Sequence, residues 1–284
     1  MIDSLKQIKN RIRSIDNTRK VMHAMEMISI AKLKISENKL LITRPYFLKL
    51  EKLLQDILTN IIGAEHSFLG KPKATDKVAL CIITSDTGLC SDYNRNIIRL
   101  AEEFINKYGN EKISLITVGK KGFTYFKKKG ANIVNKFIEL KSNYSDVTSD
   151  QILKTLTDIF LSGEACEIYL AYTYFKSLSK HIPTIEKILN IDSNVSTERI
   201  EYIIEPDTLG ILAELIPLYL SYKVKIAFLN AFMSEHASRM IAMAEATNNA
   251  KELLQDLILS RNKLRQANIT KEIIELVSSA EEVR

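Results

Sequence analysis

Tryptophan is absent from the 284-residue sequence, and glycine and proline occur only nine and five times. So few breakers favour long helices. The three cysteines, Cys81, Cys90 and Cys166, are odd in number and form no Cys-x-x-Cys pair, which predicts reduced thiols in a cytosolic protein. No run of about 18 apolar residues occurs, and the first ten residues are polar. The sequence therefore predicts neither a membrane span nor a signal peptide.

The composition is otherwise that of an ordinary soluble chain. Hydrophobic residues make up 46% and charged residues 26%, enough to bury a core in one large domain or two small ones. The net charge is +6, from 40 Lys and Arg against 34 Asp and Glu. This mild basicity permits an acidic partner but does not by itself indicate nucleic acid.

Residues 1–62 are expected to form one helix of a coiled-coil shaft. Apolar and long side chains recur at steps of three and four through Leu5, Ile8, Ile12, Ile15, Arg19 and Met22. A second line follows through Val21, Met25, Ile28 and Ile35. Pro45 interrupts the pattern and is expected to bend the helix.

Residues 208–284 are expected to form the other helix of the shaft, since no glycine follows Gly210 and no proline follows Pro217. Its seam steps by four and three through Leu229, Met233, His236, Met240, Met243, Thr247, Ala250, Leu254, Leu257, Arg261 and Leu264. A sustained 3.5-residue period indicates a coiled coil, and the N-terminal helix is the available antiparallel partner.

The two helices differ in length. At about 1.5 Å per residue, the first spans about 90 Å and the second about 110 Å, so the second should overhang its partner by about 20 Å. The overhang still carries an apolar stripe of Ile269, Ile273, Leu276, Val277 and Ala280. An exposed stripe of this kind usually marks an interface.

Residues 75–206 alternate between strand and helix patterns, which predicts a central Rossmann-like α/β domain with a mostly parallel sheet. The expected strands are 77–84, 113–119, 131–140, 166–177, 182–189 and 198–205, with helices at 92–109, 120–130 and 145–163. Short connections between the last strands indicate an antiparallel edge. The whole chain is thus an α/β fold with a long antiparallel coiled coil made from its two termini.

The stretch "TSDTGLCSDYN" (84–94) lies between a strand and a helix, where phosphate-binding loops occur. Its single glycine favours a tight turn, in which Asp86 binds loop amides, Gly88 has positive φ, and Ser91 or Asp92 caps the helix. The four histidines lack metal-ligand spacing, and a packing role is expected for His236 on the seam. No catalytic, cofactor or metal site is predicted.

Three motifs give the sequence its resemblance to the gamma subunit of the rotary, proton-driven ATP synthase of the bacterial type. They are "SIDNTRKVMHAMEMISIAKLK" (14–34), "TSDTGLCSDYN" (84–94) and "SEHASRMIAMAEATNNA…RNKLRQANITKEIIELVSSA" (234–280). Shorter matches are "VGKKG" (118–122), "PTI" (183–185) and "EPD" (205–207), so the resemblance covers nearly the whole chain. The sequence departs from the family pattern at Thr87, Ser91, Asp92, Arg261 and Ser279.

The resemblance implies a central rotor shaft without an active site. The coiled coil would turn inside a ring of three alpha and three beta subunits, while the α/β domain would bind the epsilon subunit and the c-ring. The chain would be peripheral, on the cytoplasmic face of the inner membrane. The implied contacts with the alpha/beta ring are Lys9, Lys20, Met25, Arg239, Arg265, Gln266, Ile273 and Leu276. Glu205 and Asp207 are the implied contacts with epsilon or the c-ring.

Two other functions fit parts of the sequence. The strand–loop–helix at 84–94 suits a small nucleotide-binding α/β protein with a coiled-coil arm. The first 50 residues hold eleven Lys and Arg against four Asp and Glu, which suits a coiled-coil RNA-binding protein. The balanced charges of the C-terminal helix argue against RNA, and no nucleic-acid partner is predicted.

Overall fold

The structure is a computed structural model that describes residues 2–60, 68–69, 75–140, 145–191 and 208–282. The chain divides into two compact units. Unit 1 comprises Met1–Ser29 and Met240–Arg284, and unit 2 comprises Ile30–Arg239. Two helices, α1 (Ile2–Asn60) and α5 (Thr208–Glu282), contribute to both units.

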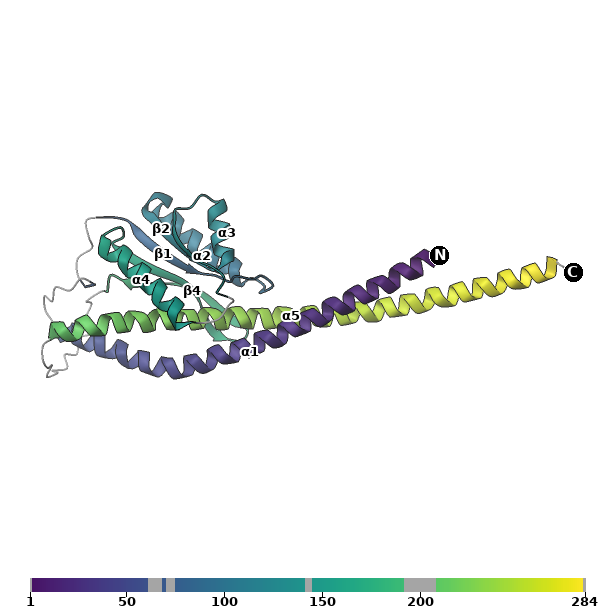
Figure 1. Ribbon diagram of the computed structural model, residues 1–284, viewed down its shortest axis with the longest axis horizontal. Helices are drawn as coiled ribbons and strands as arrows, with labels where there is room; N and C mark the ends of the chain where they lie inside the picture. The colour runs from purple at the N-terminus through teal and green to yellow at the C-terminus, as the bar shows by residue number, and fades with distance from the viewer. Residues whose placement is uncertain (1, 61–67, 70–74, 141–144, 192–207, 283–284) are drawn as a thin grey trace. The chain divides into compact units, whose positions relative to one another are not determined.

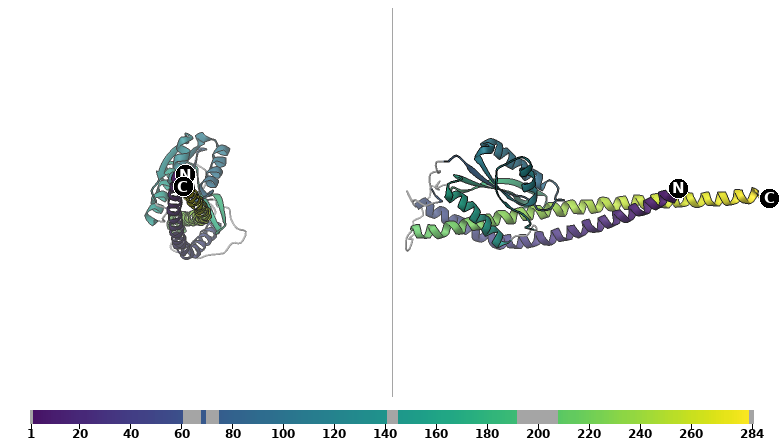
Figure 2. Two further views of the ribbon diagram at one scale, coloured as in Figure 1. Left: turned by 90° about the vertical axis from the view of Figure 1, so that its right-hand side faces the viewer. Right: turned by 45° about the horizontal axis from the view of Figure 1, so that its top comes forward.

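Unit 1 consists of the outer parts of α1 and α5, which run side by side (Figures 1 and 2). Both helices cover the described part of the predicted ranges, and α1 continues through Pro45 without a break. Every residue of the predicted α5 seam is buried or half-buried, as are the six residues of the first α1 line. These observations confirm the pairing of the two terminal helices.

The second line predicted on α1 is wrong at three of its four residues, since only Met25 is half-buried. Val21, Ile28 and Ile35 are 59%, 56% and 52% exposed. The buried positions are instead Ser29, Leu33, Ser36 and Thr43. Ser29 and Thr43 donate their hydroxyl hydrogens to the carbonyls of Met25 and Lys39, four residues earlier, and this makes small polar residues acceptable in a buried seam.

Unit 2 is built on a five-stranded sheet with the order β3-β2-β1-β4-β5. Its strands are β1 (Val78–Ile83), β2 (Ile113–Val118), β3 (Ile133–Phe137), β4 (Glu167–Ser177) and β5 (Lys180–Leu189). The β1–β2, β2–β3 and β1–β4 pairs are parallel and β4–β5 is antiparallel. The mixed sheet with an antiparallel edge was predicted; the strand predicted at 198–205 lies outside the described residues.

Helices cover both faces of the sheet (Figure 1). One face packs against α2 (Tyr93–Tyr108) and α3 (Lys120–Lys128). The other packs against α4 (Asp146–Ser162) and the inner parts of α1 and α5. Apolar residues of those two inner parts, such as Leu54 and Ile216, belong to the same core as β1, so the inner halves of both helices belong to the α/β unit.

A close approach joins the end of β1 to the start of α3. The Thr84 hydroxyl donates to the Val118 carbonyl oxygen at 2.8 Å and accepts a hydrogen bond from the Gly122 amide at 2.9 Å. A Cβ at Gly122 would lie 2.8 Å from the Thr84 Oγ1, and one at Gly119 would lie 2.1 Å from the Thr84 carbonyl oxygen. Both glycines of "VGKKG" are therefore required by packing, and they fix the loop that follows β1.

Candidate functional site

The loop after β1 is held by hydrogen bonds within the chain. The Asp86 Oδ1 accepts from the amides of Lys120 and Glu139 at 3.0 and 3.1 Å, so the prediction that Asp86 binds amides is confirmed. Asn94 reaches back from α2, where its Oδ1 accepts from the Ser85 amide and its Nδ2 donates to the Ser85 hydroxyl. The loop is thus a rigid turn tied to α2 and α3.

Two details of this turn differ from the expectation. Positive φ occurs at Leu89 (61°) and Ser91 (48°), not at Gly88. Asp92 is the N-cap residue of α2, but its side chain makes no capping hydrogen bond and pairs with Arg95 instead. Sequence reasoning assigned the left-handed conformation to the only glycine, whereas the surrounding contacts impose it on two residues with side chains.

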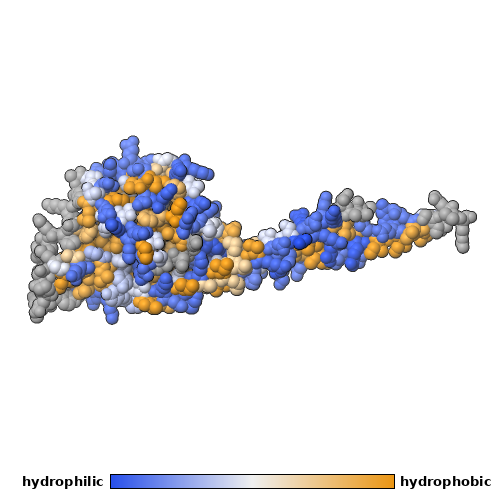
Figure 3. Space-filling view, viewed as in Figure 1, coloured by the Kyte–Doolittle hydropathy of each residue, from blue (hydrophilic) through white to orange (hydrophobic). Residues whose placement is uncertain are grey.

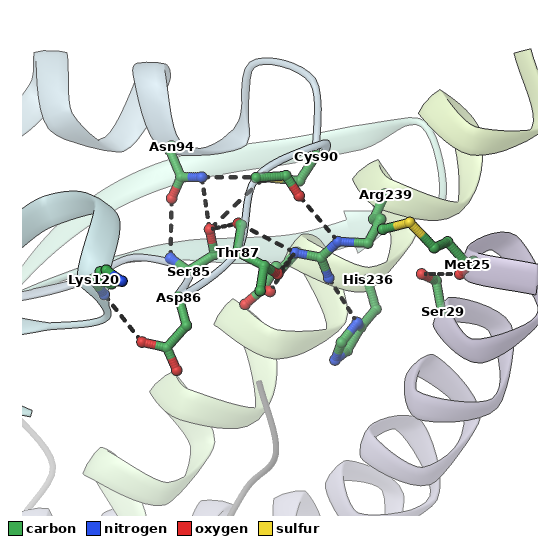
Figure 4. A network of polar contacts seen from close by, with 12 residues as sticks. Met25, Ser29, Ser85, Asp86, Thr87, Cys90, Asn94, Lys120, His236 and Arg239 are labelled. Carbon is green, nitrogen blue, oxygen red and sulfur yellow. Dashed lines mark hydrogen bonds and ion pairs between the residues drawn. The ribbon is translucent and has the colours of Figure 1, made fainter. Parts of the chain in front are cut away.

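Arg239 of α5 binds this turn from the other side (Figure 4). Its Nε donates to the Gly88 carbonyl oxygen at 3.3 Å, and its Nη2 donates to the Thr87 hydroxyl at 3.0 Å. The Nη2 also forms an ion pair with the Glu235 Oε1 at 2.7 Å. Arg239 is 5% exposed and Glu235 is fully buried. A buried ion pair thus joins α5 to the end of β1.

The neighbours of this ion pair are buried as well. The His236 Nδ1 lies 3.2 Å from the Arg239 Nη1 and accepts its hydrogen bond, because a guanidinium only donates. The predicted packing role of His236 is confirmed by this contact and by its 1% exposure. Burial raises the pKa of the Cys90 thiol and of the Tyr93 hydroxyl. Burial also raises the pKa of the Cys166 thiol, and it raises the pKa of Cys81 to about 12. All three cysteines are free and buried, and their thiols are therefore poor nucleophiles.

The position of Arg239 bears on the nucleotide-binding alternative. In open α/β sheets, ligands bind beyond the carboxyl ends of the strands where the strand order reverses, here beside β1. The turn at this point has its Thr87 and Gly88 carbonyls and its Thr87 hydroxyl engaged by Arg239. In the described part of the chain, no group of three or more His, Cys, Asp or Glu residues could hold a metal.

The contacts predicted for the shaft are distributed over unit 1. Lys9, Arg265 and Gln266 are exposed, and Met25 is half-buried. Lys20 is exposed and pairs with Asp16 at 2.8 Å. Hydrogen bonds from Lys20 and Arg19 lower the pKa of Asp16. Glu205 and Asp207 lie outside the described residues.

Arg239 differs from the other predicted contacts because its guanidinium lies inside unit 2. A contact with a partner would have to compete with its bonds to Thr87, Gly88, Glu235 and His236. Sequence reasoning missed the contact between Arg239 and Thr87, because 152 residues separate them along the chain.

The end of α5 is an exposed apolar stripe. Among the α5 residues whose exposure is described, Asn268 is the last half-buried one, and every residue from Ile269 to Ser278 is exposed. Ala280 of the predicted stripe lies outside these residues. Ile273 and Leu276 are 55% and 70% exposed. The views of unit 1 show α5 continuing beyond α1, with hydrophobic side chains along one side of this end (Figures 1 and 3). We call Ile269–Ser278 the tip.

None of the helices in the described ranges has the length and apolar character needed to cross a membrane. A family model described as ATP synthase matches residues 4–283. The ATP synthase gamma chain of Anaeromyxobacter dehalogenans (strain 2CP-1) is 35% identical over 289 residues, with 99% of each chain covered. That of Moorella thermoacetica is 34% identical over 281 residues, again with 99% of each chain covered.

Solved structures share the fold. A chain of the Euglena gracilis mitochondrial ATP synthase OSCP/F1/c-ring structure matches with a TM-score of 0.68 and 15% identity, over 100% of this chain and 95% of that one. A chain of the Tetrahymena thermophila mitochondrial ATP synthase central stalk and c-ring structure matches with a TM-score of 0.60 and 21% identity, over 80% and 99%.

Proposed function

This chain belongs to the ATP synthase gamma chain family, and we propose that it works there as the central rotor shaft. It couples proton flow through the membrane sector to ATP synthesis in a catalytic head. The observation that carries this role is the tip, an apolar helix end that the rest of unit 1 leaves exposed. A shaft that ends inside a ring of other subunits needs such a surface.

The partners we propose are a ring of three alpha and three beta subunits around the coiled coil, and the epsilon subunit and c-ring at the α/β unit. The chain has no active site of its own, and catalysis belongs to the ring. It is held at the cytoplasmic face of the inner membrane as a peripheral subunit of the complex. The exposed residues Lys9, Lys20, Arg265 and Gln266 are the proposed polar contacts with the ring, and the half-buried Met25 is a proposed apolar contact. Glu205 and Asp207 are proposed for epsilon or the c-ring.

Rotation of the shaft is coupled to catalysis because the shaft binds the different conformations of a beta subunit with different affinity. A partner can shift a conformational equilibrium only by as much as its affinity differs between the conformations. A coiled coil presents different side chains in different directions, so each beta subunit meets a different surface as the shaft turns. Rotation therefore changes which conformation of each beta subunit is favoured, and with it the affinity for ADP, phosphate and ATP.

The tip suits rotation because apolar contact is non-directional. A surface that must meet several subunits in turn gains little from hydrogen bonds that fit only one of them. Ile273 and Leu276 are the residues that we propose to contact an apolar collar formed by alpha and beta subunits. In the free chain their exposure leaves little apolar burial to lose.

The double change Ile273→Asp, Leu276→Asp tests this role. We expect the stability of the isolated chain to change by less than about 0.5 kcal/mol, because both side chains are exposed. We expect assembly with the alpha and beta subunits and the rate of ATP synthesis to fall at least about tenfold, because two charges would enter an apolar collar. Circular dichroism melting of the free chain and a reconstitution assay measure the two effects.

The matched control is Ala267→Asp, Ser278→Asp, which adds the same two charges at exposed positions on the side of the helix away from the stripe. This pair should assemble nearly as well as the parent. If both pairs assembled equally well, no collar would hold the tip. If the stripe variant lost most of its own stability, the tip would belong to the fold of this chain instead.

A further inference from the structure

The segment 119–139 has a charge that the rotor role does not explain. It holds six lysines and a single acidic residue, Glu139. Lys129 forms an ion pair with Glu102, which neutralises one of the six. Lys127 and Lys128 lie in the last turn of α3, where cations favourably oppose the helix dipole. The helix dipole does not explain Lys136, which lies on β3.

Lys127 and Lys136 approach the same aromatic ring from two different elements. Their ammonium nitrogens lie 5.6 and 4.7 Å from the centroid of the Phe123 ring. Both residues are exposed. Two like charges around one ring repel each other, and an anion between them would relieve this repulsion.

Between these lysines lies a shallow hollow of about 460 Å³. Its apolar lining comes from Phe123, Ile133 and Val134, of which Val134 is 46% exposed. The hollow lies along β3, the edge strand of the sheet. The backbone amide of Lys136 donates its hydrogen bond to the Asn135 Oδ1, so this amide is already used and does not pair with an added strand. The side chains around the hollow therefore define what binds here.

We propose that this hollow is a docking site for an acidic segment of a protein partner, in which an apolar side chain is flanked by carboxylates. The apolar side chain would pack on Phe123 and Val134, and the carboxylates would bind Lys127 and Lys136. Charge complementarity selects the acidic partner. A single phosphate group fits less well, because neither Lys127, in the last turn of α3, nor Lys136, on β3, adds the amides of a helix N-terminus, and a phosphate would leave the apolar lining unused. A membrane fits less well, because the apolar surface is recessed.

The test uses the full chain and a fluorescent peptide of sequence Glu-Glu-Phe-Glu-Glu with blocked ends, in a binding titration at low and at physiological salt. We expect saturable binding that weakens at least about tenfold when the phenylalanine is replaced by serine. We expect a similar weakening for the variant Lys127→Gln, Lys136→Gln. The control variant Lys120→Gln, Lys128→Gln removes the same charge from the same segment and should weaken binding by no more than about twofold.

Several outcomes would overturn the proposal. Equal weakening by the two lysine pairs would show diffuse attraction to a basic surface. Equal binding of the phenylalanine and serine peptides would show that the apolar lining takes no part. Binding to phosphatidylglycerol vesicles or inorganic phosphate, with no binding to the peptide, would assign the lysines to a headgroup or a phosphate. The titration uses the free chain, so its result is independent of the rotor role.

Discussion

Replacing Gly119 with alanine is expected to unfold most of unit 2. Gly119 has φ of 89° and ψ of 144°, a conformation essentially restricted to glycine, which costs a residue with a side chain about 1–3 kcal/mol. The added Cβ would also lie 2.1 Å from the Thr84 carbonyl oxygen and 2.6 Å from its carbon. Neither partner can withdraw easily, because the Gly119 amide donates to the Phe137 carbonyl and the Thr84 amide donates to the Val118 carbonyl. The total loss should exceed about 4 kcal/mol, a large part of the stability of a domain.

Gly130→Ala is the matched control for that change. Gly130 also has positive φ, 70°, but nothing lies within 4 Å of its would-be Cβ. It should therefore lose only the conformational cost of about 1–2 kcal/mol. Denaturant unfolding of both variants measures the difference. Equal losses would show that the start of α3 moves away from Thr84 without cost.

Replacing Arg239 with methionine is expected to destabilise unit 2 by about 3–5 kcal/mol, because the change removes the ion pair that Arg239 forms with the buried carboxylate of Glu235. The turn at Thr87 and Gly88 loses its hydrogen bonds to α5 at the same time. Denaturant unfolding monitored by tyrosine fluorescence reports the loss.

The double variant Glu235→Leu, Arg239→Met distinguishes an ion pair from general packing. Replacing both members of a buried pair by apolar residues is often nearly neutral, whereas removing one is costly. We therefore expect the double variant to be more stable than Arg239→Met alone, by at least about 2 kcal/mol. If the stability losses of Glu235→Leu and Arg239→Met, each measured alone, add up to the loss of the double variant, the two residues are not energetically coupled.

The regular parts of the fold could be predicted because their patterns repeat. The α5 seam from Leu229 to Leu264 keeps one period over many turns, and each of its residues is covered. The β1 run Val78–Ile83 is uniformly apolar, and β1 is the central strand of the sheet, buried on both of its faces. Short connections between β4 and β5 indicated their antiparallel pairing, which the structure confirms.

The other features depend on contacts between distant residues. On α1 the buried seam passes through Ser29 and Ser36, while Ile28 and Ile35 lie exposed beside it. Apolarity alone selects the wrong line there, since the serine hydroxyls are small and can bind their own helix. The resemblance implied that Arg239 contacts the ring, and nothing in the local sequence showed that Glu235 and the turn at Thr87 enclose its guanidinium.

The most direct test of the rotor role is to purify the ATP synthase from membranes and determine its structure with all subunits identified. The account predicts one copy of this chain on the central axis, with the tip inside a ring of three alpha and three beta subunits and the α/β unit at the c-ring. A complex that lacks this chain, or that holds it at the periphery with Ile273 and Leu276 in solvent, would contradict the account.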